Sequence, residues 1–99
     1  MSRPGGAVSE AGVLRLNGPL TMRTAPEALQ RGRDAVAAGD VVIDFAAIAE
    51  ADSAALGLLL DWMRAGREAG HKVQVRGLPR GLQSLAELYG IQDLLPLAP

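Results

Sequence analysis

The sequence contains no cysteine among its 99 residues. This excludes disulfides, thiol catalysis and cysteine metal sites, and it agrees with a reducing compartment such as the cytoplasm. Aromatic residues are almost as scarce: Phe45, Trp62 and Tyr89 are too few to form the stacking surfaces on which many proteins bind bases. The formal net charge is −1, which favours neither nucleic-acid binding nor attraction to an anionic membrane.

Long apolar runs are also missing. No segment reaches the length needed to cross a bilayer, and the start, MSRPGGAVSEAG, lacks the apolar stretch of a signal peptide. We therefore expect a cytoplasmic protein without direct membrane insertion. The length predicts one domain with one core. Pro4-Gly5-Gly6 opposes regular structure, so residues 1–6 are predicted to be a flexible N-terminal tail before a domain over residues 7–99.

Hydrophobic periodicity predicts the order strand, strand, helix, strand, helix, strand, helix. A first hairpin followed by parallel strands gives a mixed sheet covered by about three helices, which is an α/β fold. The predicted strands are Ala7–Ser9, Val13–Asn17, Val41–Phe45 and Lys72–Gly77, and the predicted helices run from Thr24 to Ala38, from Ser53 to Ala69 and from Pro79 to Gly90.

Two further predictions concern the helices at either end of this order. Thr24 and Glu27 have the spacing of a capping box for the first helix. In the last helix, an apolar stripe is predicted to face inward, and the apolar residues after it are predicted to pack across the core. The stripe comprises Leu82, Leu85, Ala86, Leu88 and Tyr89, and the residues after it are Ile91, Leu94 and Leu95.

The stretch from Val41 to Gly70 is the candidate functional region. It combines a buried strand, a connection over Ala46 to Asp52 and the start of a helix, which is the usual functional corner of an α/β domain. At 100° per residue, Trp62 lies near the middle of a broad apolar arc. Gly57 and Leu60 instead lie on the polar side, in line with Ser53 and Arg64.

The position of Gly57 and Leu60 has two interpretations. Single exposed leucines are common, so the pattern is compatible with tolerated exposure. However, a glycine inside a helix costs roughly 1 kcal/mol relative to alanine. Alternatively, Ser53, Gly57, Leu60 and Arg64 form a contact stripe along which a partner comes close to the helix.

Catalytic and metal-binding patterns are weak in this sequence. Asp44, Glu50 and Asp52 are the kind of carboxylates that hold Mg²⁺, but structural roles at a strand end, in a loop and at a helix start explain them better. His71 is the only histidine and has no nucleophile at a familiar spacing. No phosphate-binding loop or nucleophile elbow occurs. We therefore predict no enzyme activity, no metal and no cofactor.

Ser53 has a structural and a functional interpretation. As an N-cap, its hydroxyl would accept a bond from a free backbone N–H and stabilise the helix by about 1 kcal/mol. The same position at a helix N-terminus would also accommodate a phosphate.

The order of these segments resembles a STAS domain over roughly residues 8 to 95. The residues that carry the resemblance are VVIDF, the loop ending in Asp52-Ser53, AALGLLL, GHKVQVRGLP and LAELYGI. STAS domains include the bacterial anti-sigma-factor antagonists. In that group the resemblance implies phosphorylation of Ser53 by an anti-sigma-factor kinase, although Ala54 and Ala55 depart from the usual motif.

The sequence is similar in more detail to the MlaB-like STAS subunits of phospholipid-transport ABC complexes. The shared features are the short Asp-Ser-small-small-Leu motif, the leucine run that follows and LAELYG near the end. This resemblance implies a non-catalytic subunit, cytoplasmic and peripheral to the inner membrane, that binds the ATPase of the transporter involved in outer-membrane lipid asymmetry. The predicted partner-binding residues are Asp52, Ser53, Gly57, Leu60 and Arg64.

Overall fold

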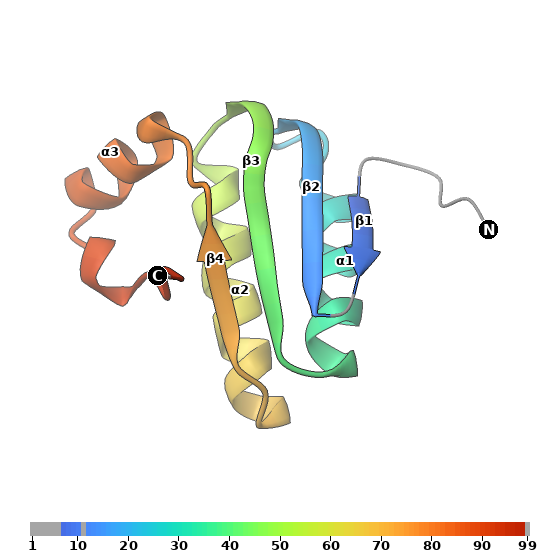
Figure 1. The fold of residues 1–99 in the computed structure, drawn as a ribbon. Coiled ribbons are helices and arrows are strands. Elements are labelled where there is room, and N and C mark those ends of the chain that lie inside the picture. Colours follow the sequence, from blue (N-terminus) through green and yellow to red (C-terminus); the bar gives the residue numbers. More distant parts are fainter. Residues whose placement is uncertain (1–6, 11, 99) are drawn as a thin grey trace.

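The computed structural model describes residues 7–10 and 12–98; the predicted tail, residues 1–6, lies outside them. The described chain follows the predicted order of elements (Figure 1). The strands are β1 (Ala7–Glu10), β2 (Val13–Leu20), β3 (Val41–Ala51) and β4 (Val73–Arg76). The helices are α1 (Ala25–Ala38), α2 (Ala54–Ala69), α3 (Arg80–Leu88) and the short 3₁₀ helix η1 (Gln92–Leu94).

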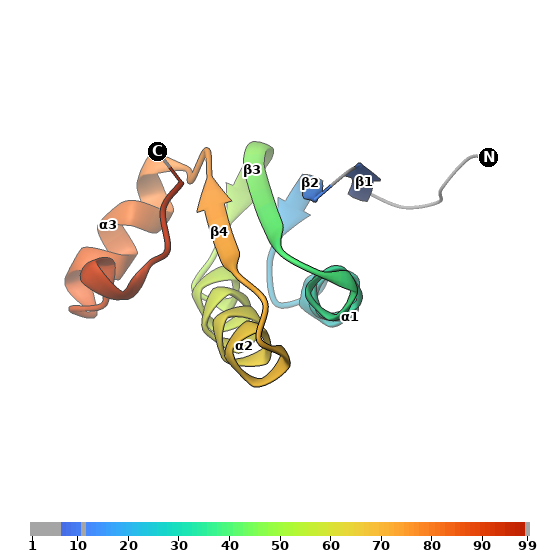
Figure 2. The same ribbon diagram turned by 60° about the horizontal axis from the view of Figure 1, so that its bottom comes forward.

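The four strands form one sheet in the order β1-β2-β3-β4. β1 pairs antiparallel with β2, whereas β2, β3 and β4 are mutually parallel, so the predicted hairpin followed by parallel strands is confirmed. Leu14, Ile43 and Val75 lie side by side across the three parallel strands and are all buried. α1 and α2 cover one face of the sheet (Figure 2). Because the three side chains are buried, they point to this covered face.

Both strands of the central pair are longer than predicted. β3 continues to Ala51, through the segment Ala46 to Asp52 that was predicted to be a loop, and β2 continues past Gly18 and Pro19 to Leu20. The register between these strands shifts twice beyond Arg15, so this part of the ladder is irregular. Pro19 is tolerated here because, among the described residues, β1 pairs with Val13–Leu16 and leaves β2 without a neighbouring strand on that side at Pro19.

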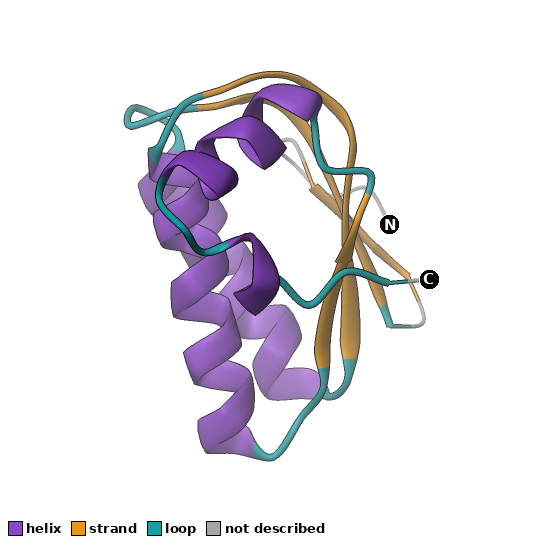
Figure 3. Ribbon diagram, turned by 90° about the vertical axis from the view of Figure 1, so that its left-hand side faces the viewer, coloured by secondary structure: helices purple, strands orange, loops and turns teal. Residues whose placement is uncertain are grey.

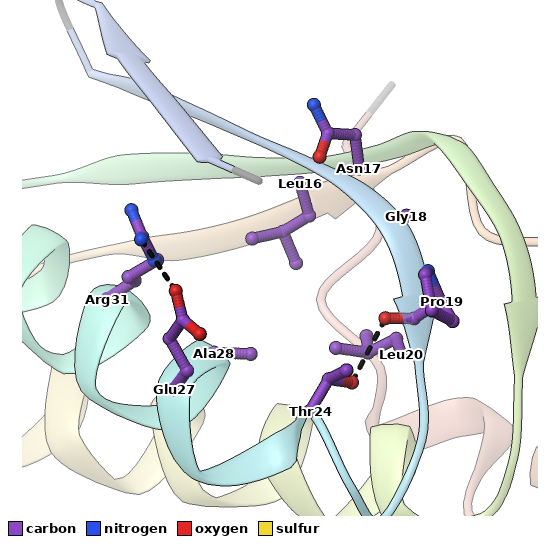
Figure 4. Close-up of a pocket in the computed structure, with 9 residues that line it drawn as sticks. All are labelled: Leu16, Asn17, Gly18, Pro19, Leu20, Thr24, Glu27, Ala28 and Arg31. Carbon is purple, nitrogen blue, oxygen red and sulfur yellow. Dashed lines mark hydrogen bonds and ion pairs between the residues drawn. The ribbon is translucent and has the colours of Figure 1, made fainter. Parts of the chain in front are cut away.

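The predicted capping box at the start of α1 is wrong. The Thr24 side chain makes no helix-capping bond; its hydroxyl accepts from the Thr21 N–H (2.9 Å) and donates to the Pro19 carbonyl (3.0 Å). Glu27 forms an ion pair with Arg31 one turn later at 2.7 Å instead of reaching back (Figure 4). Thr24 therefore connects the end of β2 to α1.

The predicted inward stripe of α3 is only partly correct. Leu82 and Ala86 are buried and Leu85 is half-buried, but Leu88 and Tyr89 are 75% and 57% exposed. α3 lies beyond the β4 edge instead of over the sheet, so its last turn has little to cover (Figures 1 and 2).

The chain after α3 also departs in one place from the prediction. Leu95 is buried and Ile91 is half-buried, as predicted, whereas Leu94 is 58% exposed. Past η1 the chain returns to the sheet (Figure 3), where Val75 donates its N–H to Pro96 and accepts one from Ala98.

Trp62 is fully buried, as predicted, and lies against Gly32 of α1. Its indole Nε1–H donates to the Leu29 carbonyl at 3.1 Å, which satisfies the one polar atom of the ring. A Cβ at position 32 would overlap Cε2 and Nε1 of that ring. Glycine is therefore required at position 32 for α1 and α2 to pack this closely.

Gly32→Ala is expected to destabilise the protein even though alanine is the better helix former. Overpacking in a core costs typically 1–3 kcal/mol, more than the roughly 1 kcal/mol that alanine gains in a helix. The matched control is Gly57→Ala, because a Cβ at position 57 meets no atom within 4 Å. In urea unfolding, the free energy of unfolding should be lower than that of the parent for Gly32→Ala and higher for Gly57→Ala. Equal stability of the two variants would contradict this packing.

A second contact between α1 and α2 is ionic. The Arg33 guanidinium donates from Nε and Nη2 to the two oxygens of Asp61, at 2.9 and 2.8 Å. These hydrogen bonds are the main reason that the pKa of Asp61 lies below its ordinary value of 3.8, although partial burial opposes the shift.

The Arg33–Asp61 pair gives stability a predictable pH dependence. Because the folded-state pKa of Asp61 is lowered, its contribution is present above about pH 4 and is lost as the pH falls through the lowered pKa. Asp61→Asn should therefore be less stable than the parent at pH 7, with the difference shrinking towards pH 2. Urea unfolding across this range measures it, and a difference that does not change with pH would contradict it.

Candidate functional site

Asp52 joins the start of α2 to the turn after β2. Its Oδ1 accepts from the Ala54 N–H at 2.8 Å and its Oδ2 from the Met22 N–H at 3.2 Å. One carboxylate thus satisfies a donor of the first helical turn and holds the neighbouring loop beside it. Asp52, and not Ser53, supplies the side-chain oxygen that caps α2.

Ser53 occupies the N-cap position, but its hydroxyl makes no capping bond. The prediction that this hydroxyl caps the helix is wrong, because the Asp52 side chain takes the Ala54 N–H and the Asp52 carbonyl takes that of Ala55. Ser53 is exposed, so its hydroxyl faces solvent at the N-terminus of the helix.

The hydrogen bonds of Asp52 make the start of α2 less suited to a phosphate on Ser53. A phosphate on Ser53 would find the first amides of α2 already bonded to Asp52, and the Asp52 carboxylate would stand beside it. The helix dipole still favours an anion at this end, but the N–H groups of Ala54 and Ala55 are already hydrogen-bonded in the described structure.

Four of the five predicted partner-binding residues form an exposed row on α2. Ser53, Gly57, Leu60 and Arg64 all lie on the solvent side, and Leu60 is 40% exposed. The row spans about 16 Å at roughly 1.5 Å per residue. We call these four residues the α2 stripe. At Gly57 the backbone is bare, because nothing lies within 4 Å of a Cβ placed there.

The structure adds Met22 to this region, which sequence reasoning missed. Met22 is 75% exposed, and its backbone is bonded to Asp52, next to Ser53. The only sequence signal was an apolar residue in an otherwise polar turn. Met22 therefore extends the α2 stripe towards α1 with a flexible apolar side chain.

The three acids considered for Mg²⁺ are not arranged as a metal site. Asp44 lies on the open sheet face, where it accepts from Arg76 at 3.1 Å and from the Ala46 N–H at 2.8 Å. The Ala46 bond is the main reason that the Asp44 pKa is lowered. Asp52 is bonded to backbone, and Glu50 is exposed on β3. Among residues 7–10 and 12–98 no three His, Cys, Asp or Glu side chains group to hold a metal.

His71 has a structural contact. Its Nδ1 lies 2.6 Å from the Val36 carbonyl near the end of α1, and the ring is half-buried. Since a carbonyl only accepts, Nδ1 carries the proton. The ring therefore connects the α2–β4 turn to α1.

A small cavity of about 240 Å³ lies between β2 and α1. Leu16, Leu20 and Ala28 form its apolar base, and the Glu27–Arg31 pair stands at its rim (Figure 4). It contains none of the predicted site residues. Within the described residues, no helix has the length and apolar character of a membrane span.

Several solved structures share this fold. SpoIIAA of Bacillus, an anti-sigma-factor antagonist, matches in its unphosphorylated form with TM-score 0.72 and 16% identity over 94% of this chain and 86% of that chain. An antagonist from Mycobacterium paratuberculosis matches with TM-score 0.73 and 26% identity over 94% and 82%. A putative anti-sigma-factor antagonist from Thermotoga maritima matches with TM-score 0.74 and 14% identity. The match covers 92% of this chain and 82% of that chain.

The family follows from the sequence match. Residues 6–96 match the family model described as "Mlab, STAS domain". The chain therefore belongs to the MlaB-type STAS-domain family, and the predicted family and fold are confirmed. None of the curated proteins compared with the chain matches it significantly. STAS domains are protein-interaction domains and are typically non-catalytic.

The capping geometry predicts a difference between two adjacent residues. Asp52→Ala removes two acceptors of backbone N–H groups and should cost about 1–2 kcal/mol. Ser53→Ala should change the free energy of unfolding by less than about 0.5 kcal/mol, as exposed substitutions usually do. Thermal or urea unfolding of both variants tests this, and a larger loss for Ser53→Ala than for Asp52→Ala would show that Ser53 is the cap.

Proposed function

We propose that this protein is a non-catalytic accessory subunit of a bacterial phospholipid-transport ABC transporter of the Mla type. As a single domain over residues 7–99, it would bind the cytoplasmic ATPase, support its assembly and activity, and sit beside the inner membrane through that complex. The observation that carries the proposal is the α2 stripe in a chain of the MlaB-type family.

Each residue of the stripe suits a docking surface in a different way. Gly57 lets a partner's backbone approach α2 directly, Leu60 offers apolar area, and the Ser53 hydroxyl both donates and accepts. The Arg64 side chain is 67% exposed, and its contact with Asp61, at 3.4 Å, is longer than the 2.8 Å contact that Asp61 makes with Arg33. The Arg64 guanidinium therefore has donors left for a partner. Asp52 supports the surface by holding Met22 beside Ser53.

A phosphorylatable anti-sigma-factor antagonist is the second candidate. It is favoured by the exposed hydroxyl of Ser53, which makes no capping bond, and by the 26% identity to the antagonist from Mycobacterium paratuberculosis. Its partner would be an anti-sigma-factor kinase, and Ser53 would be the phosphorylated residue. Incubation with such a kinase followed by mass spectrometry distinguishes the two candidates.

The docking proposal predicts that Gly57→Arg stays folded but loses the ATPase. Arginine is a better helix former than glycine, and the position has open space, so the variant should melt at or above the parent temperature. The added side chain should prevent close approach and reduce co-purification with the ATPase by at least about tenfold. Ser53→Asp, which places a charge on the same row, should also reduce it.

Gly81→Arg is the matched control, because Gly81 is also helical, exposed and without neighbours within 4 Å, but lies on α3. It should co-purify like the parent. Normal co-purification of folded Gly57→Arg and Ser53→Asp would remove the α2 stripe from the interface.

A further inference from the structure

A groove of about 420 Å³ lies beside the α2 stripe, between the second half of α2 and η1. α3 and η1 arch away from the sheet before the chain returns to β4 (Figure 3). The residues that line the groove are Leu60, Met63, Arg67, His71, Val73 and Leu94. Leu60 belongs to both surfaces, so the groove and the α2 stripe are continuous.

The walls of this groove are apolar and partly exposed. Leu94 is 58% and Leu60 40% exposed, and Met63 between them is half-buried. Large apolar side chains from two elements that face one recess are typical of a binding site for another apolar group. Met63 adds a side chain that adapts to the shape of its neighbour.

The ionisable groups in the groove are both bases. Arg67 is exposed, and its side chain forms no ion pair or hydrogen bond within residues 7–10 and 12–98. His71 uses Nδ1 for the Val36 carbonyl and leaves Nε2 for another partner. No acidic residue lines the groove. Charge complementarity therefore favours an occupant that carries a carboxylate.

Two other occupants fit this chemistry less well. A second copy of the chain in symmetric contact would bring the same basic groove to itself and place like charges together. A membrane surface requires several basic residues, each worth about 1 kcal/mol near anionic lipid, whereas the groove has one arginine and is a recess.

We propose that the groove receives an apolar side chain from an acidic segment of the ATPase partner, with a carboxylate of that segment bound to Arg67. This inference rests on the proposed function and extends its interface from the α2 stripe across Leu60 to η1. The apolar side chain contacts Leu60, Met63 and Leu94, and Arg67 fixes the direction of the segment.

Binding of the purified ATPase subunit of an Mla-type transporter from the same organism, measured by calorimetry, tests the groove. Arg67→Glu should weaken binding by at least about tenfold, because it places like charges together, and Leu94→Ala by roughly fivefold. Arg80→Glu is the matched control, an exposed arginine on α3 with no side-chain bond in the described structure; it should bind within about twofold of the parent. Unchanged melting of all three variants is required first.

Charge exchange identifies the partner's carboxylate. Among Asp→Lys and Glu→Lys variants of the ATPase, at least one should restore binding to Arg67→Glu and weaken binding to the parent. Parent-like binding of Arg67→Glu and Leu94→Ala, together with loss of binding by Gly57→Arg, overturns the groove and leaves the proposed function in place. No binding of the parent to the ATPase overturns the proposed function itself.

Discussion

The contact between the Trp62 ring and Gly32 determines how α2 lies on the rest of the domain. The ring fills the space left by a missing side chain on α1, and its N–H bonds to α1 backbone. Because interiors are close-packed, such a contact allows little freedom in the position of either helix. The residues buried on one side of α2 therefore determine which side faces solvent. The row from Ser53 to Arg64 lies on that solvent-facing side. The same helix thus carries both the central core residue and the candidate contact surface.

A second constraint acts at the N-terminal end of the same helix. Asp52 bonds to the backbone on both sides, once within α2 and once in the turn that precedes α1. The chain can therefore keep a serine at the N-cap position without using its hydroxyl. A side chain without a structural duty is available for contact or modification, and Ser53 is such a residue. The neighbouring Asp52 contributes to any interface indirectly, by positioning Ser53.

The sequence predicted the order of elements, the mixed sheet, the buried Trp62 and the exposed row on α2, because these follow from hydrophobic period and helical phase. It did not predict the full length of β3, since Ala46–Ala51 is rich in alanine and irregular in register. It also placed Leu88, Tyr89 and Leu94 inside, because periodicity identifies an apolar face without showing whether a sheet lies beneath it. The capping role went to the wrong neighbour, because Asp52 and Ser53 are both good caps and only coordinates distinguish them.

The edges of the sheet limit how this domain can meet other proteins. On one side, the outermost strand β1 has only four residues. On the other, Pro96 and Ala98 occupy the backbone N–H and C=O of Val75 at the middle of β4. Within residues 7–10 and 12–98, neither edge offers a long row of open backbone groups, so addition of a foreign strand there is disfavoured. Recognition then depends on side chains, which encode partner identity far more selectively than a shared peptide backbone does.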